Sequence, residues 1–173
     1  MADTGFKTSG NIVSAGTWTG FTTTNLNTSD NTDATASSTV FVTGTTNNFS
    51  FGIPSGSTIN GIEAQAEFAM NSGAATATIQ LSLSYNNGSN YTATKSDTVT
   101  GTTDTTRTYG GAADTWGRSW TDSEFANGTF VLKVEGKSST GQPMGLDYIA
   151  VKVYYTAATF TGASILYLLA AQG

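Results

Sequence analysis

Residues 62–70 read Ile62-Glu63-Ala64-Gln65-Ala66-Glu67-Phe68-Ala69-Met70. Apolar side chains stand at every even position of this stretch, and polar side chains stand at three of its four odd positions. A period of two places alternate side chains on opposite faces of an extended chain. The stretch therefore predicts a β-strand with one buried face.

The same alternation recurs along the chain in residues 75–85 and 130–135. Residues 149–155 are apolar on both faces, which predicts a central strand. Shorter strands are expected at residues 40–42 and 48–51. Turn-forming clusters of Gly, Asn, Ser and Pro separate these runs. The pattern predicts an all-β fold, an antiparallel, jelly-roll-like β-sandwich.

The composition limits both the size of the fold and its chemistry. A chain of 173 residues suits one domain, and 38% of the residues are hydrophobic. The chain has no cysteine and no histidine. These absences exclude a disulfide framework, a Cys or His metal site and a Ser-His-Asp triad. We therefore expect neither a cofactor nor an enzyme activity.

The two ends of the sequence differ from its middle. Residues 1–16 are polar and punctuated by glycine, so we predict an N-terminal arm, flexible or bound to a partner. Residues 17–158 carry the strand patterns and form the predicted sandwich domain. Residues 159–173 form an apolar tail, a candidate assembly element.

The tail contains one compact apolar run, and its members are Ile165, Leu166, Tyr167, Leu168 and Leu169. The run is too short to span a bilayer as a helix, which takes about 20 residues. Exposed to water it would favour aggregation. Two locations are open: the run packs on its own sandwich as a final strand or short helix, or it docks on a neighbouring subunit.

The charge pattern bears on partners and location. The net charge is −5, and the seven Lys and Arg residues are scattered singly. A nucleic-acid or polybasic membrane contact needs clustered basic residues, so we expect neither. The N-terminus has no apolar stretch of signal-peptide length, which predicts synthesis in the cytoplasm.

The carboxylates are the first candidate sites. Glu63 and Glu67 lie four residues apart on one strand, about 13 Å at 3.3 Å per residue, too far for a glycosidase pair. Aspartates in the loops offer oxygen ligands for a cation, but turn-forming hydrogen bonds explain them better. These loop aspartates are Asp30, Asp33, Asp104, Asp114 and Asp122. Asp147 precedes the predicted last strand and is expected to accept backbone N–H groups as a loop anchor.

The aromatic residues leave two roles open. Trp116, Trp120 and Tyr109 lie close together in the sequence and can form a glycan-stacking surface if they are exposed. Large side chains are scarce in this chain, so burial in the core is the favoured alternative.

Three stretches carry a family resemblance. Residues 49–63 read FSFGIPSGSTINGIE, residues 109–121 read YGGAADTWGRSWT and residues 146–156 read LDYIAVKVYYT. In this order they resemble the FxIPxGxxIxGIE, YGGxxDxWGxxWT and DxIxVxVYYT motifs of a family of β-sandwich modules. The modules occur in bacteriophage virion proteins. The resemblance covers about residues 17–156.

The resemblance implies a structural virion protein of a tailed bacteriophage, such as a capsid cement (decoration) protein. Its expected partners are further copies of itself, with a trimer favoured, and other virion proteins such as the major capsid protein. Its expected location is the virion. The alternative is a receptor- or glycan-binding module of a tail fibre or spike. The resemblance supplies no catalytic residues.

Overall fold

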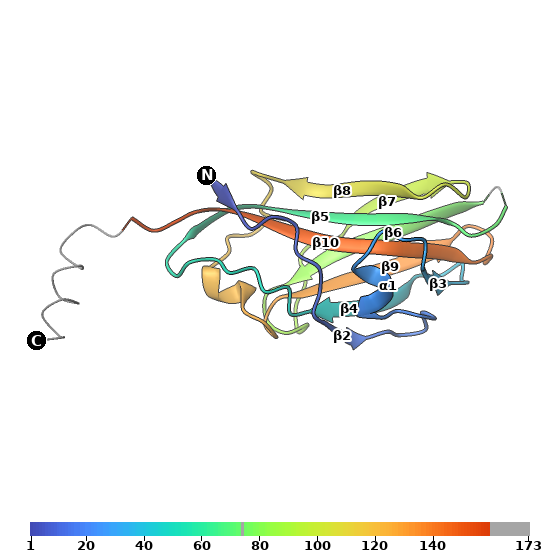
Figure 1. The fold of residues 1–173 in the computed structure, drawn as a ribbon, viewed down its shortest axis with the longest axis horizontal. Coiled ribbons are helices and arrows are strands. Elements are labelled where there is room, and N and C mark those ends of the chain that lie inside the picture. The colour runs from blue at the N-terminus through green and yellow to red at the C-terminus, as the bar shows by residue number, and fades with distance from the viewer. Residues whose placement is uncertain (74, 160–173) are drawn as a thin grey trace, which may run out of the picture.

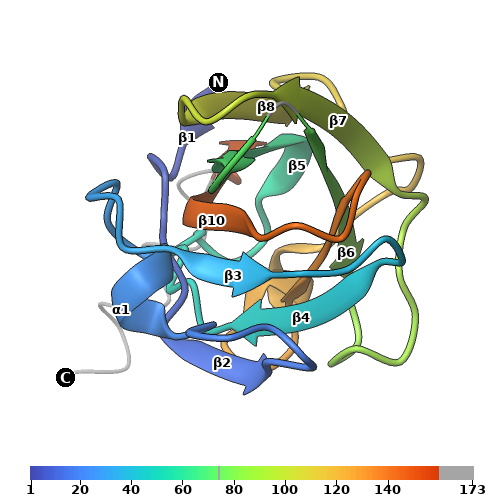
Figure 2. The ribbon, with the colours of Figure 1, turned by 90° about the vertical axis from the view of Figure 1, so that its right-hand side faces the viewer.

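The computed structural model describes residues 1–73 and 75–159, and these form two antiparallel β-sheets packed face to face (Figures 1 and 2). The predicted all-β antiparallel sandwich is confirmed. The jelly-roll arrangement stays a prediction. In the described part of the chain, no helix has the length and apolar character needed to cross a membrane.

The first sheet is built around two long strands that pair along most of their length, β5 (Thr58–Met70) and β10 (Met144–Thr156). Strand β8 (Thr105–Gly111) pairs with the other edge of β5. Two short strands, β1 (Ala2–Asp3) and β3 (Ala34–Ala36), pair with opposite ends of β10. The run that predicted a central strand is therefore central, because β10 has partners on both edges.

The second sheet runs in the order β2-β4-β9-β6-β7. Its strands are β2 (Asn11–Ser14), β4 (Val42–Asn47), β9 (Val131–Ser138), β6 (Thr76–Ser84) and β7 (Lys95–Thr100). Within the described ranges, the loops contain one short α-helix, α1 (Thr23–Leu26), and one 3-10 helix, η1 (Asp122–Phe125).

The core lies between the sheets and uses the residues that the alternation selected. Side chains from β5, β6, β9 and β10 are fully buried there. The largest of them include Phe68, Ile79, Leu81, Leu132 and Ile149. A hydrophobic face on each sheet therefore explains why the two sheets pack together.

The segment predicted as an N-terminal arm lies along the sandwich. Ala2 and Asp3 pair with Tyr155 and Tyr154, and strand β2 extends the second sheet. Between them, Lys7 exchanges two backbone hydrogen bonds with Val151. Backbone pairing to both sheets holds residues 1–16 against the body. Sequence patterns missed this because short edge strands need little apolar alternation.

Two predicted strands are wrong. Residues 40–42 contribute only Val42 to β4, and Val40 is 71% exposed. Residues 48–51 form a loop, because Asn48 and Ser50 have φ of 62° and 52°. This left-handed backbone is incompatible with a strand. Strands β7 and β8 were missed, since their sequences are mostly polar and exposed.

Gly136 lies in the middle of β9, where the indole of Trp18 packs on the backbone. A Cβ there would lie 2.5 Å from two ring atoms of Trp18. The ring is held in place because its Nε1 donates to Val42 O at 3.1 Å. We expect Gly136→Ala to cost about 1–3 kcal/mol of the free energy of unfolding, as overpacking does.

Denaturant unfolding measures this cost. Gly111→Ala is the matched control, since a Cβ at Gly111 meets no atom within 4 Å. Equal stability of the two variants would show that Trp18 moves aside freely.

Candidate functional site

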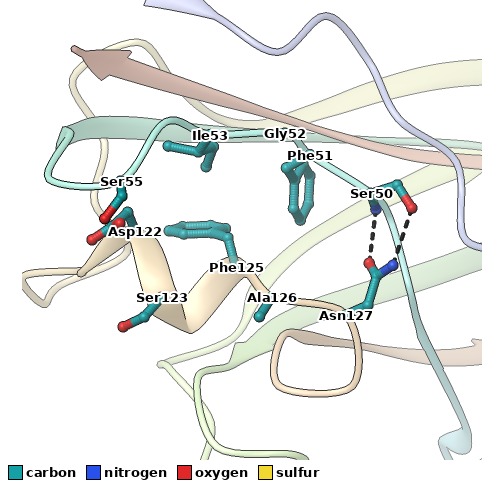
Figure 3. Close-up of a pocket in the computed structure, with 10 residues that line it drawn as sticks. All are labelled: Ser50, Phe51, Gly52, Ile53, Ser55, Asp122, Ser123, Phe125, Ala126 and Asn127. Carbon is teal, nitrogen blue, oxygen red and sulfur yellow. Dashed lines mark hydrogen bonds between the residues drawn. The ribbon is translucent and has the colours of Figure 1, made fainter. Parts of the chain in front are cut away.

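A pocket of about 470 Å³ opens between the β4–β5 loop and η1 (Figure 3). The loop supplies residues 50–53 and Ser55. The η1 segment supplies Asp122, Ser123 and residues 125–127. The volume falls in the range of small-ligand pockets, about 300–1,000 Å³.

The shape of the β4–β5 loop comes from a backbone φ angle that alternates in sign along residues 48–52. Asn48, Ser50 and Gly52 all have positive φ, whereas the phenylalanines between them do not. This alternation points the side chains of Phe49 and Phe51 into the core, where they are 3% and 4% exposed. The side chain of Ser50 is exposed to solvent. The loop thus gives the pocket an apolar floor and a polar edge.

An aromatic cluster forms the floor and the layer beneath it. Phe51 meets Phe125 edge to face, with ring centroids 5.5 Å apart. Phe130 lies below both, at 5.2 Å from Phe51 and 5.3 Å from Phe125. Trp120 completes the cluster at 5.2 Å from Phe125. Contacts of this kind add about 0.5–1.5 kcal/mol per pair beyond area burial, so the floor is rigid.

Hydrogen bonds across the pocket join its two walls, and Figure 3 shows those between Ser50 and Asn127. The Ser50 amide donates to Asn127 Oδ1 at 3.0 Å, and Asn127 Nδ2 donates back to Ser50 Oγ at 3.2 Å. Farther along, the Gly56 amide donates to Asp122 Oδ2 at 3.0 Å. The walls are therefore fixed relative to each other without a bound ligand.

An ion pair between Arg118 and Glu124 stabilises the 3-10 helix η1. Arg118 donates to Glu124 Oε1 at 2.7 Å, and its guanidinium carbon lies 3.8 Å from the Tyr85 ring centroid. Burial, the largest influence, raises the pKa of Glu124, but hydrogen bonds from Arg118 and the Thr121 amide together outweigh it and lower the pKa below its usual value. Glu124 is thus held ionised, and its charge stabilises the η1 turn.

The three candidate glycan-stacking residues lie inside the protein. Tyr109 and Trp116 are each 4% exposed, and Trp120 is 7% exposed. None presents a ring face to solvent, so these residues do not form a stacking surface. The favoured alternative, a core role, is confirmed by their burial.

Trp116 fastens the loop after β8 to strand β5. Its Nε1 donates to Ile62 O at 3.0 Å, and the Ile62 amide donates to Asp114 O at 2.9 Å. Asp114 Oδ1 accepts from the Trp116 amide, and Lys95 binds Asp114 Oδ2 at 2.7 Å. The Lys95 hydrogen bond is the main cause that lowers the pKa of Asp114. The residues of the 109–121 motif therefore have a structural role, because they hold the loop after β8 against strand β5.

The candidate interface residues of the tail lie outside the described residues. They are Ile165, Leu166, Tyr167, Leu168 and Leu169.

A second, polar hollow of about 230 Å³ is lined in part by Asp33, Asn71, Thr102 and Asp104. Burial is the main cause that raises the pKa of both aspartates, and neighbouring carboxylates add to it. One of these neighbours is Asp147, which is 1% exposed and occupies a bulge where β10 shifts register against β5. Asp147 accepts from the Thr32 amide at 3.1 Å, so its predicted role as a loop anchor is confirmed.

Of the other three loop aspartates, Asp30 and Asp114 make the local bonds expected of turns, whereas Asp122 accepts from the distant Gly56 amide. Asp30 accepts from the Thr32 amide and Asp114 from the Trp116 amide. Within residues 1–73 and 75–159, no group of three acidic residues has the arrangement of a metal site. Glu63 pairs with Lys152 and accepts from Tyr154, so it has partners of its own, apart from Glu67.

The raised pKa of Asp104 predicts a stabilising substitution. A group whose pKa is higher in the folded state is destabilising when charged, and that penalty disappears as the pH falls to 3.8. We expect Asp104→Asn to stabilise the fold at pH 7 by up to about 1 kcal/mol, since the group is partly solvated.

Thermal unfolding at several pH values checks the expectation. The advantage of Asp104→Asn over the wild type is expected to shrink as the pH falls toward 3.8 and to be absent below it. Asp104→Glu keeps the charge and is the control. A constant advantage at every pH would mean that charge is not the cause.

Comparisons with known proteins leave the family of the chain open. No protein-family model matches it, and no curated protein matches it.

Among solved structures, the chain is similar to an arabinose-bound GH51 α-L-arabinofuranosidase, at 13% identity and a TM-score of 0.45. The match covers 70% of this chain and 19% of that one. It is also similar to the CBM22-1–GH10 modules of Clostridium thermocellum endo-1,4-β-D-xylanase 10B complexed with xylohexaose, at 10% identity and a TM-score of 0.40. That match covers 79% of this chain and 25% of that one. With TM-scores below 0.5, we draw nothing on function from either.

Proposed function

We propose that the chain is a non-enzymatic structural module of a tailed-bacteriophage particle, present in many copies and acting through protein–protein contacts. A capsid cement protein is the role that the motif resemblance favours, with the major capsid protein and further copies of the chain as partners. The observation that carries the proposal is the burial of Tyr109, Trp116 and Trp120. The rings that a glycan-binding module would display are used to hold the fold together.

The surface of the described residues supports the same proposal. Charged residues make up only 11% of the chain, and among the described residues the exposed large hydrophobic side chains are Met1, Val13 and Val40. Short Thr and Ser hydroxyls line much of the accessible sheet surface, as in the hollow formed by Thr39, Thr76, Thr78 and Thr98. Such side chains form interfacial hydrogen bonds at a small entropic cost.

Light scattering on the purified full-length chain tests the self-association part of the proposal. We expect a discrete homo-oligomer, with a trimer favoured, at micromolar concentration. A truncation ending at Ala158 shows whether the tail or the sandwich holds the oligomer. A monomer in both forms, at all accessible concentrations, would contradict self-association.

A glycan array separates the proposal from the receptor- or glycan-binding alternative. We expect no saccharide signal from the full-length chain. A reproducible saccharide signal from the folded full-length chain would support the alternative.

A further inference from the structure

The pocket beside η1 has an apolar floor, and an apolar floor of this kind is suited to binding an apolar group. Ile53, Phe51 and Phe125 line the floor, and polar groups of Ser50, Ser123 and other residues line the rim (Figure 3). The two walls are already joined by the bonds between Ser50 and Asn127 and between Gly56 and Asp122. A preformed hollow of this kind binds an apolar group without rearrangement.

The path of the chain brings a suitable segment to this pocket. Beyond β10, Ala158 lies against Gly56, where a methyl group on the glycine would be 3.3 Å from the Ala158 Cβ. Gly56 adjoins Ser55 and binds Asp122, and both of these line the pocket. Figure 1 likewise places the end of β10, the β4–β5 loop and η1 at one end of the sandwich. The chain therefore leaves the described structure at the edge of the pocket.

We propose that the apolar run Ile165–Leu169 of the same molecule occupies this pocket. Six residues, 159–164, separate Ala158 from the run. Six residues span at most about 20 Å when fully extended. The pocket wall begins at Ser55, next to the glycine that Ala158 contacts. The linker is long enough, and short enough to keep the run nearby.

The tether selects the same molecule over a second copy. A segment tethered by a short linker has an effective concentration of about a millimolar at a site within reach. A shallow apolar pocket is then filled from its own chain at any micromolar protein concentration. A second copy would have to bind with a much higher affinity to compete.

The chemistry of the run matches this pocket better than it matches the hollow at Asp33 and Asp104 or the hollow at Thr76 and Thr98. Residues 159–173 contain no charged side chain. The hollow at Asp33 and Asp104 is acidic, and the hollow at Thr76 and Thr98 is lined by hydroxyl groups and Lys137. Burying an apolar run against polar groups leaves those groups without water, which is costly. The proposal concerns the chain itself and does not depend on its role in a particle.

Disulfide trapping tests the proposal cleanly, because the chain has no cysteine. Ser123→Cys places a thiol on the exposed rim, and Ala170→Cys places one directly after the run, which stays intact. Mild oxidation at micromolar concentration is followed by intact mass and by non-reducing electrophoresis. We expect an intramolecular disulfide that forms at least about fivefold faster than in a control pair, reflecting a docked rather than a diffusing tail.

The control pair is Ala113→Cys with Ala170→Cys. Ala113 is exposed and lies beside Ala112, which packs on Gly61 near the end of β10 but outside the pocket. A second control adds Leu166→Ser and Leu168→Ser to the Ser123→Cys and Ala170→Cys pair, and trapping is expected to fall to the level of the Ala113 pair.

Two results would overturn the proposal. Equal trapping rates for the Ser123 and Ala113 pairs would show that the run does not select the pocket. Disulfide-linked dimers in place of monomers would show that the run of a second copy fills it. Disulfide-linked dimers would also indicate self-association through the tail, whereas equal trapping rates would leave self-association open, and light scattering measures it separately.

Discussion

Replacing Trp116 with alanine is expected to lower the free energy of unfolding by about 3–5 kcal/mol, the usual cost of removing a buried tryptophan. The side chain is 4% exposed and holds the loop after β8 to Ile62 of β5. Its loss leaves a cavity and removes the indole donor from the Ile62 carbonyl. Since domains of this size are stable by about 5–15 kcal/mol, the change is large.

Urea unfolding followed by circular dichroism measures this effect without relying on tryptophan fluorescence. Trp116→Phe keeps an aromatic ring but removes the Nε1 donor, so we expect an intermediate cost, with about 1–3 kcal/mol from the unpaired carbonyl. Val13→Ala, at a side chain that is 49% exposed, is the surface control and is expected to stay within about 0.5 kcal/mol. A loss below about 1 kcal/mol for Trp116→Ala would show that the loop is not anchored there.

Replacing Phe130 with alanine is expected to have a similar effect, about 3–5 kcal/mol. Phe130 is 1% exposed and contacts four rings of the aromatic cluster, those of Phe49, Phe51, Trp120 and Phe125. Phe51 and Phe125 also form the floor of the pocket, which loses its support from below. The substitution is therefore expected to change the shape of the pocket as well as to lower the free energy of unfolding.

Phe130→Leu is the matched control, because it keeps most of the volume and loses only the aromatic geometry. We expect it to cost less than about 1.5 kcal/mol. Denaturant unfolding gives both values. Equal costs for alanine and leucine would assign the stability to ring–ring geometry instead of buried volume.

The strands with strong alternation were predictable because their pattern is local. Residues 62–70, 75–85, 130–135 and 149–155 lie in or overlap four strands that supply most of the core. Strands β7 and β8 were not predictable, since they are held by their neighbours β6 and β5 and carry few apolar residues. Their backbones are extended because they form hydrogen bonds with β5 and β6, and these contacts leave no pattern in the sequences of β7 and β8.

The pocket could not be predicted because its walls are far apart in the sequence. Ser50 and Asn127 are separated by 77 residues, and Gly56 and Asp122 by 66. One local signal existed: Gly52, Pro54 and Gly56 close together indicated a shaped loop. It did not show that residues 48–51 leave the strand, because the left-handed φ of Asn48 and Ser50 depends on tertiary contacts. Nor did it show that η1 faces this loop.

The sequence by itself determined the β class, the main core strands and the absence of cysteine and histidine chemistry. These depend on residue type and on a period of two, which any extended chain expresses locally. Only the tertiary structure decided which aromatic rings are buried and where residues 1–16 pair. It also decided that Asp104 and Asp147 lie close enough to Asp33 to help raise the pKa of Asp33. Each of these depends on contacts between distant segments, whose distances are set when the two sheets pack.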